Sequence, residues 1–425
     1  MTTVDIIVAG AGPAGLASAA ALATSGFSVA VVAPRAPARA PDTRTAALFN
    51  GSLALLQNIG AWDSLAADTA ALAGIRIIDD RDTLLRAPAV TFEAHELGLT
   101  AFGANVPQEA LARALRDAVE RLVNVQFIDA QVTAVDVVTS ATRPQPTGHD
   151  GYTHVHLDTG MILRAALVVA ADGRNSTCRK AANIAAEVTN YPQIAIAAQF
   201  GHSREHRGIS TEFHRPAGPC TVVPLPGRRS SLVWVERPSI ARRLVAADDA
   251  AFTAALEERL HGVLGTVTAI GERRHFPLSC VKAHTLAAPR VALVGEAGHT
   301  LPPIGAQGLN LGFRDVATLA ELVGAARAAG CDIGGQAVLD RYAAARRTDI
   351  DVRTRAVDWL NRSLLADMLP SDLARGASLH LIGGIAALKR QVMRAGFEPA
   401  GSLPHLMRPS LERVPVAIPA LDARP

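Results

Sequence analysis

Residues 290–315, RVALVGEAGHTLPPIGAQGLNLGFRD, determine how the rest of the chain is interpreted. The stretch begins as a short buried strand, and a loop rich in proline and glycine then leads to a helix that starts near Gln307. Pro302-Pro303 stiffens this loop, while Gly305 and Gly308 lack the β-carbons that would keep a flat ring away from the backbone. Unpaired N–H groups at the helix start favour negative charge. The pattern predicts a ligand-binding turn.

The N-terminus carries a second turn of this kind. A strand-like run from Val4 to Ala9 is followed by the turn Gly10-Ala11-Gly12-Pro13-Ala14-Gly15, an Ala/Leu-rich helix and a second strand that ends at Ala33. These glycines allow a tight turn, the approach of a pyrophosphate to the helix N-terminus and close packing of helix on strand, so the order predicts dinucleotide binding. An acid is expected where Ala33 stands. The nearby Arg35 leaves open a reading in which the 2′-phosphate of NADP is bound.

Three further residues are candidate ligand contacts. Asp172 lies at the tip of a buried strand, in ADGRNS, where its carboxylate needs a ligand or a loop amide as partner. Arg44, in DTRTAAL, is expected near the start of a helix that runs to about Ile59, and either neutralises a pyrophosphate or is a solvated surface residue. Gln108 lies in the first turn of a helix entered through Pro107, a position that usually faces solvent.

The middle and the end of the chain have different patterns. Alternating strands between residues 193 and 273 predict a separate, mostly antiparallel sheet inserted into a doubly wound α/β domain. Residues 337–365 predict a long Arg-rich amphipathic helix. The segment 373–395 predicts a core-facing helix pair or a shallow membrane-contact surface. The Pro-rich tail from residue 399 is expected to be unstructured.

Composition excludes several classes of function. The 425 residues are 49% hydrophobic and 19% charged with a net charge of +3, which is typical of a soluble globular protein and gives no basic run for nucleic acid. Four dispersed cysteines suit a reducing cytosol. We expect no secretory signal and no transmembrane span. His202 and His206 are four residues apart but lack an acidic third ligand, so no metal site is predicted.

Five of these segments together resemble a known family: GAGPAG, DTRTAAL, NVPQEAL, AADGRNS and GEAGHTLPPIGAQGLNLGFRD. They are similar to the single-component FAD-dependent aromatic hydroxylases, the class that includes para-hydroxybenzoate hydroxylase. Residues 210–238 resemble the substrate-domain sheet of the UbiH-type hydroxylases of ubiquinone biosynthesis. The resemblance implies an α/β fold, in which a Rossmann-like FAD-binding domain of the GR2 type carries an inserted, mostly antiparallel β-sheet substrate domain and C-terminal helices.

The expected domain boundaries follow from this fold. The FAD-binding domain takes residues 1–75, 100–180 and 285–330, the substrate domain 76–99 and 181–284, the C-terminal helical region 331–398, and the tail 399–425.

The resemblance also assigns roles to individual residues. The glycines of the first turn would contact the FAD pyrophosphate, and Asp172 would serve FAD and help to position the nicotinamide cofactor. Glu296, where the family usually has Asp, would hydrogen-bond a ribityl hydroxyl. Pro303 and Gly305 would line the flavin ring at the reacting centre. The complete set of expected cofactor-binding residues is Gly10, Gly12, Gly15, Arg44, Gln108, Asp172, Gly295, Glu296, Gly308, Leu309 and Asn310.

The implied function is ring hydroxylation of a polyprenylated phenol in ubiquinone biosynthesis. In such enzymes NAD(P)H reduces FAD, O2 adds at the flavin C4a carbon, and the hydroperoxide transfers an oxygen to the phenol. Two alternatives stay open, an FAD-dependent prenyl reductase and a non-catalytic flavin-binding subunit of a biosynthetic complex. The protein is expected to be cytoplasmic, and peripheral contact with the inner face of the membrane stays open. Other ubiquinone-biosynthesis proteins and a second copy of the chain are open possibilities as partners. With only Tyr152, Tyr191 and Tyr342 available, no tyrosine relay for the phenol proton can be placed.

Overall fold

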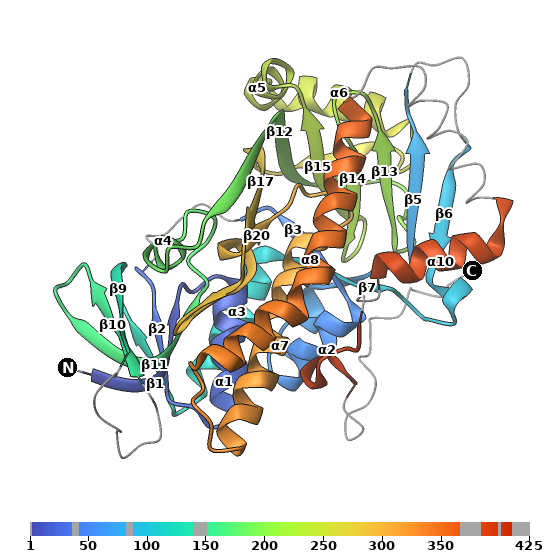
Figure 1. Cartoon of the computed structure of the whole chain (residues 1–425). Coiled ribbons are helices and arrows are strands. Elements are labelled where there is room, and N and C mark those ends of the chain that lie inside the picture. The colour runs from blue at the N-terminus through green and yellow to red at the C-terminus, as the bar shows by residue number, and fades with distance from the viewer. Residues whose placement is uncertain are drawn as a thin grey trace.

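Two large sheets and two long helices, of which the longer reaches from one sheet to the other, dominate the molecule (Figure 1). The computed structural model describes residues 2–35, 42–81, 88–139, 151–365, 384–397 and 401–409. The polar loop expected at residues 140–151 and the first part of the segment 373–395 therefore lie largely outside the described residues. All statements below concern the described part of the chain.

The first sheet, called here the parallel sheet, has the strand order β18-β19-β11-β1-β2-β8, with β10 and β9 continuing from β11. Its central strands are continuous apolar runs that are buried on both faces, as strands of a helix-covered parallel sheet must be. The bounds are β1 (Thr2–Ala9), β2 (Val29–Val32), β8 (Val125–Ile128), β9 (Val132–Thr139), β10 (Gly151–Leu157), β11 (Ile162–Ala170), β18 (Ala287–Ala288) and β19 (Val291–Leu293).

The register of the parallel sheet aligns three strand ends. Ala9 of β1 pairs with Ala170 of β11, and Ala170 pairs with Leu293 of β19. The glycine turn, the Asp172 loop and the Gly295 loop therefore leave the sheet side by side. Carboxyl ends of parallel strands are where such sheets bind ligands.

The second sheet, called here the antiparallel sheet, has the order β20-β17-β12-β15-β14-β13-β5-β6, with β16 beside β12. Its pairs are antiparallel except that of β13 with β5. Phe200, Phe213, Leu232 and Trp234 pack under helices on one face. The bounds are β5 (Gly74–Asp79), β6 (Val90–Glu93), β12 (Ala186–His202), β13 (Ile209–His214), β14 (Cys220–Leu225), β15 (Arg229–Glu236), β16 (Val267–Ile270), β17 (Arg274–Ala283) and β20 (His299–Thr300).

Helices cover the parallel sheet and connect the two sheets. α1, α3 and α7 pack together over the parallel sheet. α8 begins beside β18 and reaches β12, where Asp358 accepts a hydrogen bond of 2.6 Å from Tyr191 (Figure 1). The α-helices are α1 (Pro13–Thr24), α2 (Asn50–Asn58), α3 (Gln108–Glu120), α4 (Thr177–Ala181), α5 (Pro238–Ala246), α6 (Asp249–Leu260), α7 (Gln307–Ala328), α8 (Gln336–Leu365) and α10 (Ala386–Phe397). Short 3-10 turns are η1 (Ala66–Asp68), η2 (Ala94–Leu97), η3 (Gly295–Ala297) and η4 (His405–Met407).

The fold class expected from the sequence is confirmed, but two local expectations were wrong. Residues 45–49 form a strand, β3 (Thr45–Phe49), because they pair with β7 (Gly103–Pro107) in a small sheet completed by β4 (Ala70–Ala71). Arg44 thus precedes a strand and does not open a helix. The described part of the tail, residues 401–409, is ordered. Met407 is buried, and Asn58 donates hydrogen bonds to the carbonyl oxygens of Leu406 and Arg408.

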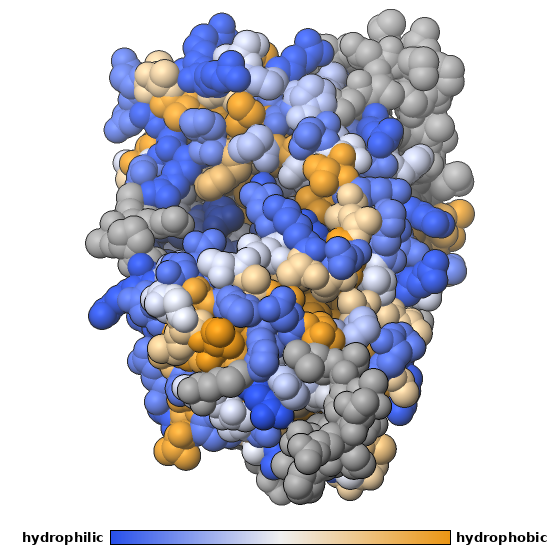
Figure 2. Space-filling model, turned by 60° about the vertical axis from the view of Figure 1, so that its left-hand side comes forward, coloured by the Kyte–Doolittle hydropathy of each residue, from blue (hydrophilic) through white to orange (hydrophobic). Residues whose placement is uncertain are grey.

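The outer surface shows no continuous apolar face in the view of Figure 2, where hydrophobic residues lie in small groups among hydrophilic ones. α10 has a core-facing side: Phe397 stacks on Phe102 at 4.1 Å between ring centroids, and Met393 is buried. Val392 of α10 and Ile385 just before the helix are exposed. In the ranges that the structure covers, every helix is too short or too polar to cross a bilayer.

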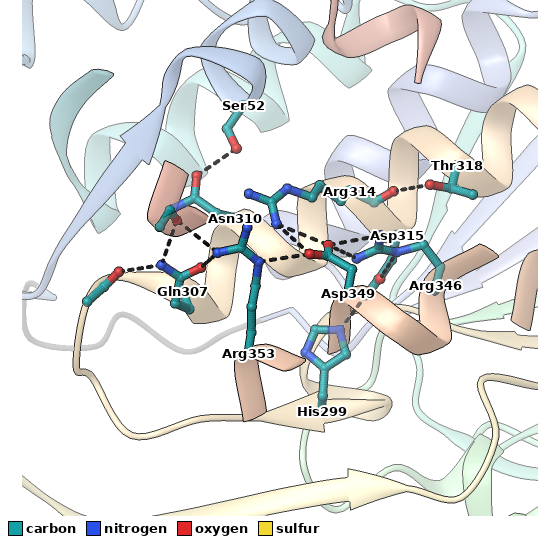
Figure 3. A network of polar contacts seen from close by, with 12 residues as sticks. Ser52, His299, Gln307, Asn310, Arg314, Asp315, Thr318, Arg346, Asp349 and Arg353 are labelled. Carbon is teal, nitrogen blue, oxygen red and sulfur yellow. Dashed lines mark hydrogen bonds and ion pairs between the residues drawn. The ribbon is translucent and has the colours of Figure 1, made fainter. Parts of the chain in front are cut away.

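A buried ionic network fixes α7 against α8 (Figure 3). Asp315 is its centre: the carboxylate accepts hydrogen bonds from the Gly295 N–H at 3.1 Å and from Arg346 at 2.8 Å, and lies 2.6 Å from His299 Nε2. Burial alone would raise the pKa of the Asp315 carboxyl, but His299 and Arg346 lower it below its usual value. One carboxylate therefore connects β20, α7 and α8 to the tip of β19.

Asp349 on α8 is the second acid of this network. Arg314, Arg346 and Arg353 all donate hydrogen bonds to its carboxylate. Burial opposes the ionisation of Asp349, but these guanidinium groups lower its pKa to about 2. Arg353 also donates to Gln307 Oε1 at 2.6 Å, so the network reaches the loop in front of α7. Buried charges of both signs are paired here, as burial requires.

We predict that Asp349 contributes to acid stability. The folded pKa of about 2 lies below the ordinary value of about 3.9, so the stabilisation is complete above about pH 5 and is lost as the pH falls toward 2. The difference corresponds to about 2 kcal/mol, of which about half is lost by pH 3. Urea denaturation of wild type and Asp349→Asn from pH 7 to pH 3 should show a free-energy gap that narrows in acid. Asp249→Asn, which removes an exposed partner of Arg273, is the control and should shift stability by about 0.5 kcal/mol or less. A gap independent of pH would contradict the assignment.

Candidate active site

A cavity of about 300 Å³ lies between the loop in front of α7 and the antiparallel sheet. Residues expected as ligand contacts line one side of it, including Arg44, Gln108 and Glu296. The other side is formed by β12, β13, β14, β15 and β17. The cavity thus joins the predicted dinucleotide site to the sheet that the sequence predicts as a separate unit.

The first glycine turn contains two kinds of glycine. Gly10 has φ of 108°, and a Cβ there would lie 2.3 Å from the carbonyl oxygen of Ala171. A Cβ on Gly15 would lie 2.0 Å from the carbonyl oxygen of Gly10. These close backbone contacts require glycine at both positions. A Cβ on Gly12, in contrast, would have no protein atom within 4 Å among the described residues. Gly12 is the N-cap of α1, so the turn leaves open space at a helix N-terminus, where an anionic group is favoured.

Arg44 lies at the rim of the cavity, where its carbonyl accepts a hydrogen bond from the Gln108 N–H at 2.9 Å. Its guanidinium donates to both carboxylate oxygens of Asp42, which raises the pKa of Arg44, and lies 5.1 Å from the ring centroid of Phe276. The side chain is about half exposed. Asp42 and Phe276 thus hold a cation at the cavity entrance.

Asp172 uses its carboxylate within its own loop. It accepts hydrogen bonds from the Ser176 hydroxyl at 2.5 Å and from the Cys178 N–H at 3.0 Å. Of the two partners expected for this acid, a loop amide is the one that the structure provides. Asp172 is half-buried and does not line the cavity.

Glu296 and Gly295 follow β19 and have different surroundings. Glu296 is exposed, lines the cavity and lies 4.0 Å from Arg174. Gly295 has φ of 56°, and a Cβ there would be 3.0 Å from the Ala14 side chain of α1. Gly295 therefore permits the close packing of α1 against the β19 tip, whereas Glu296 is directed to the cavity.

The loop before α7 contributes Pro303 and Gly305 to the cavity wall, and the first turn of α7 contributes Gly308 and Leu309. A Cβ on Gly308 would have no described atom within 4 Å, so this position is also open to a ligand. Asn310 behaves differently from expectation. Its side chain is fully buried and accepts from the Phe49 N–H and the Ser52 hydroxyl while donating to the carbonyl oxygens of two other residues, so it ties α7 to β3 and α2 (Figure 3).

The antiparallel sheet was expected to be the substrate domain, but the individual residues on the sheet side of the cavity were not predicted. It is mostly apolar, with Ala195, Ala197, Val223, Val233 and Leu278 among its residues. The polar exceptions include Ser210 and Glu212 of β13 and Thr221 of the neighbouring β14. A signal for them existed: Ser210, Glu212 and His214 alternate with Phe213 and other residues that point to the opposite face.

The network residues around Asp315 and Asp349 were also missed. They lie in the helices α7 and α8, and a single sequence does not show which arginines of an Arg-rich amphipathic helix are buried. His299 stands in the quoted loop but has no partner nearby in sequence, since its carboxylate partner is sixteen residues away.

The two histidines considered for metal binding are engaged elsewhere. His202 contacts the Arg204 carbonyl and the Ser230 hydroxyl, and His206 contacts the Leu225 carbonyl. In the described ranges no group of three or more His, Cys, Asp or Glu side chains is arranged to hold a metal ion. A hollow of about 620 Å³ near His206 is polar and lies away from the glycine turns.

Comparison with known proteins gives consistent relatives. The chain is 35% identical to "Ubiquinone hydroxylase UbiL" of Rhodospirillum rubrum, over 92% of this chain and 88% of that protein. It is 29% identical to "3-demethoxyubiquinol 3-hydroxylase" of Escherichia coli, over 92% and 97%. Among solved structures, p-nitrophenol 4-monooxygenase PnpA from Pseudomonas putida DLL-E4 shares the fold, with a TM-score of 0.75, 19% identity and coverage of 95% and 100%.

The family comparison covers most of the chain. A model described as "FAD binding domain" matches residues 3–358, which include all three strand tips and the cavity between the sheets. Gly12 and Gly308 leave open space at the site. Because the match covers most of its residues, the chain belongs to this FAD binding domain family.

Proposed function

We propose that this protein is an FAD-dependent monooxygenase that hydroxylates the aromatic ring of a prenylated phenol in ubiquinone biosynthesis. The observation that carries the proposal is one cavity shared by the loop before α7 and the apolar wall of the antiparallel sheet. The names of the relatives, which are hydroxylases of ubiquinone biosynthesis, support the substrate class.

The residues present fit FAD. Gly12 and Gly308 leave space that a side chain would fill, and Arg44 supplies a cation at the cavity rim. We assign the pyrophosphate to the N-terminus of α1 with Arg44, the ribityl chain to Gln108 and Glu296, and the flavin ring to the Pro303–Gly305 side of the cavity. Bound FAD supplies the redox and oxygen-activating chemistry. The side chains orient the ring, exclude water and bind the substrate.

The sheet wall suits a prenylated phenol. Val223, Val233 and Leu278 present apolar surface to a prenyl chain, whose burial is worth about 25 cal/mol per Å². Glu212 and Thr221 supply polar groups for a phenolic hydroxyl. Polar groups that are few and fixed within an apolar cavity are typical of sites that orient a small molecule.

The finer points are also proposals. NAD(P)H would be the electron donor and O2 the co-substrate, as in the enzymes that the sequence resembles. Peripheral membrane contact would involve the exposed Trp359 and Val352 of α8, two turns apart on one helix face. Such contact would give a prenylated substrate a route out of the bilayer. A second copy of the chain or other ubiquinone-biosynthesis proteins are further candidate partners.

The first prediction of the proposed function concerns the reaction. Purified holoprotein, given NAD(P)H, a short-chain prenyl phenol and isotopically labelled O2, should form a product with one labelled oxygen on the ring. Mass spectrometry of the product distinguishes the alternatives. A prenyl reductase would add hydrogen to the chain and no label, and a non-catalytic subunit would give neither product; either result would refute the proposal.

The second prediction uses the two kinds of glycine in the first turn. Gly12→Ala should fold with unchanged apoprotein stability but bind FAD at least tenfold more weakly, because its Cβ enters ligand space. Gly15→Ala should instead lower the apoprotein melting temperature, since its Cβ meets the Gly10 carbonyl. Thermal melting of apoprotein and titration with FAD separate the two effects. Equal FAD affinity in Gly12→Ala and wild type would remove the pyrophosphate assignment.

A further inference from the structure

A buried carboxylate–imidazole pair stands in the sheet wall of the cavity, where the proposed function requires a phenol. Glu212 Oε1 lies 2.6 Å from His214 Nε2. Both residues are buried, and Glu212 lines the cavity while His214 lies two residues further along β13. Alternation along a strand places both side chains on the same face.

This pair has no evident structural purpose in its surroundings. The cavity wall on the sheet side is mostly apolar, and a carboxylate in such a place costs free energy unless it is paired. His214 pairs with one of its oxygens. The other oxygen, Oε2, has no hydrogen-bond partner among the described residues and is not enclosed by protein. It is available to a ligand in the cavity.

We propose that Glu212 is the catalytic base that accepts the proton of the phenolic hydroxyl, and that His214 is the positioning residue that holds its carboxylate. This inference rests on the proposed function. It fills a gap that the three tyrosines leave. Tyr342 is buried with its hydroxyl on the Leu293 carbonyl, and Tyr191 donates to Asp358. Tyr152 lies on β10 of the parallel sheet and does not line the cavity.

The proton balance is simple. As the ring carbon would bond to one oxygen of O2, the O–O bond would break and the second oxygen would leave as water with the two electrons of the electron donor. In the same step the phenolic O–H bond breaks, its proton moves to Glu212 Oε2, and its electron pair remains on the phenolic oxygen and raises electron density in the ring. When the hydroxylated ring regains aromaticity, it loses the carbon-bound proton to solvent. The phenolic oxygen then takes back the proton from Glu212, which restores the carboxylate. A base within hydrogen-bond reach of its proton is the geometric requirement for this step.

The kinetic test compares Glu212→Gln with Glu236→Gln. Glu236 is a buried carboxylate on β15 of the same sheet that does not line the cavity, so the chemical change is matched. For a prenyl phenol, kcat of Glu212→Gln should fall about a hundredfold with KM within about threefold of wild type. The loss should shrink as nitro or fluoro substituents make the phenol more acidic, since an acidic phenol needs less help from a base. An equal loss for every phenol, or a similar loss in Glu236→Gln, would reduce Glu212 to a structural role.

A binding experiment tests contact without turnover. A prenylated 4-nitrophenol, whose ionised form is yellow, is added at one fixed pH to oxidised holoprotein without electron donor. Because a carboxylic acid is the stronger acid, the proton should stay on the phenol and donate to Glu212, so wild type should bind the colourless form. Glu212→Gln should bind a larger yellow fraction, since a neutral amide neither accepts as strongly nor repels the phenolate. The same fraction in both proteins would overturn the proposal.

His214 requires its own variants. His214→Gln keeps an N–H donor for Glu212, whereas His214→Leu removes it. If His214 positions the base, His214→Gln should retain several-fold more kcat than His214→Leu, and the yellow fraction of bound probe should change in the same order. Equal values in the two variants would remove the positioning role. Failure of the proposed function is separate: wild type would then not hydroxylate any phenol, whereas failure of this inference leaves wild type active and the effect of Glu212→Gln independent of the acidity of the phenol.

Discussion

The carboxylate of Asp315 is the interaction on which the geometry of the site depends. It accepts a hydrogen bond from the Gly295 N–H at the end of β19, contacts His299 of β20, and is paired with Arg346 of α8. All of these partners are buried. A charge that is buried and fully bonded tolerates little displacement, because any lost bond leaves a desolvated group without compensation. The loop between β20 and α7 is therefore anchored at both ends.

Close backbone packing adds a second constraint. Gly295 and Gly312 lie against Ala14, which brings the N-termini of α1 and α7 to the same edge of the parallel sheet. Both helix starts then face the region where the three strand tips meet. The proposed cofactor site is thus a consequence of sheet register and small residues, while the proposed substrate side comes from a different sheet with its own core. Chemistry at the boundary can vary through residues of β13 and β14 without disturbing the anchored loop.

The sequence predicted the fold because its strongest signals are local. The glycine turn, the apolar strands and the Pro/Gly loop each lie within a few residues, and their order along the chain is that of a known family. Positions that depend on partners far away were not predicted. Residues 45–49 became a strand because β7 pairs with them, and Asn310 turned inward because β3 and α2 offered bonds. Asp172 is the opposite case, because the loop amide expected as one possible partner lies within its own loop. Glu212 was missed because the alternation of polar residues along β13 indicates a face but not the cavity that this face lines.

The C-terminal helix α10 has an effect far from its own position in the chain. Arg353 donates to the Gly396 carbonyl as well as to Gln307. Phe397 stacks on Phe102 and meets Phe49 edge to face. Lys389 adds an ion pair with Glu96. Removal of α10 would thus loosen the loop between β20 and α7 from behind and uncover two aromatic rings.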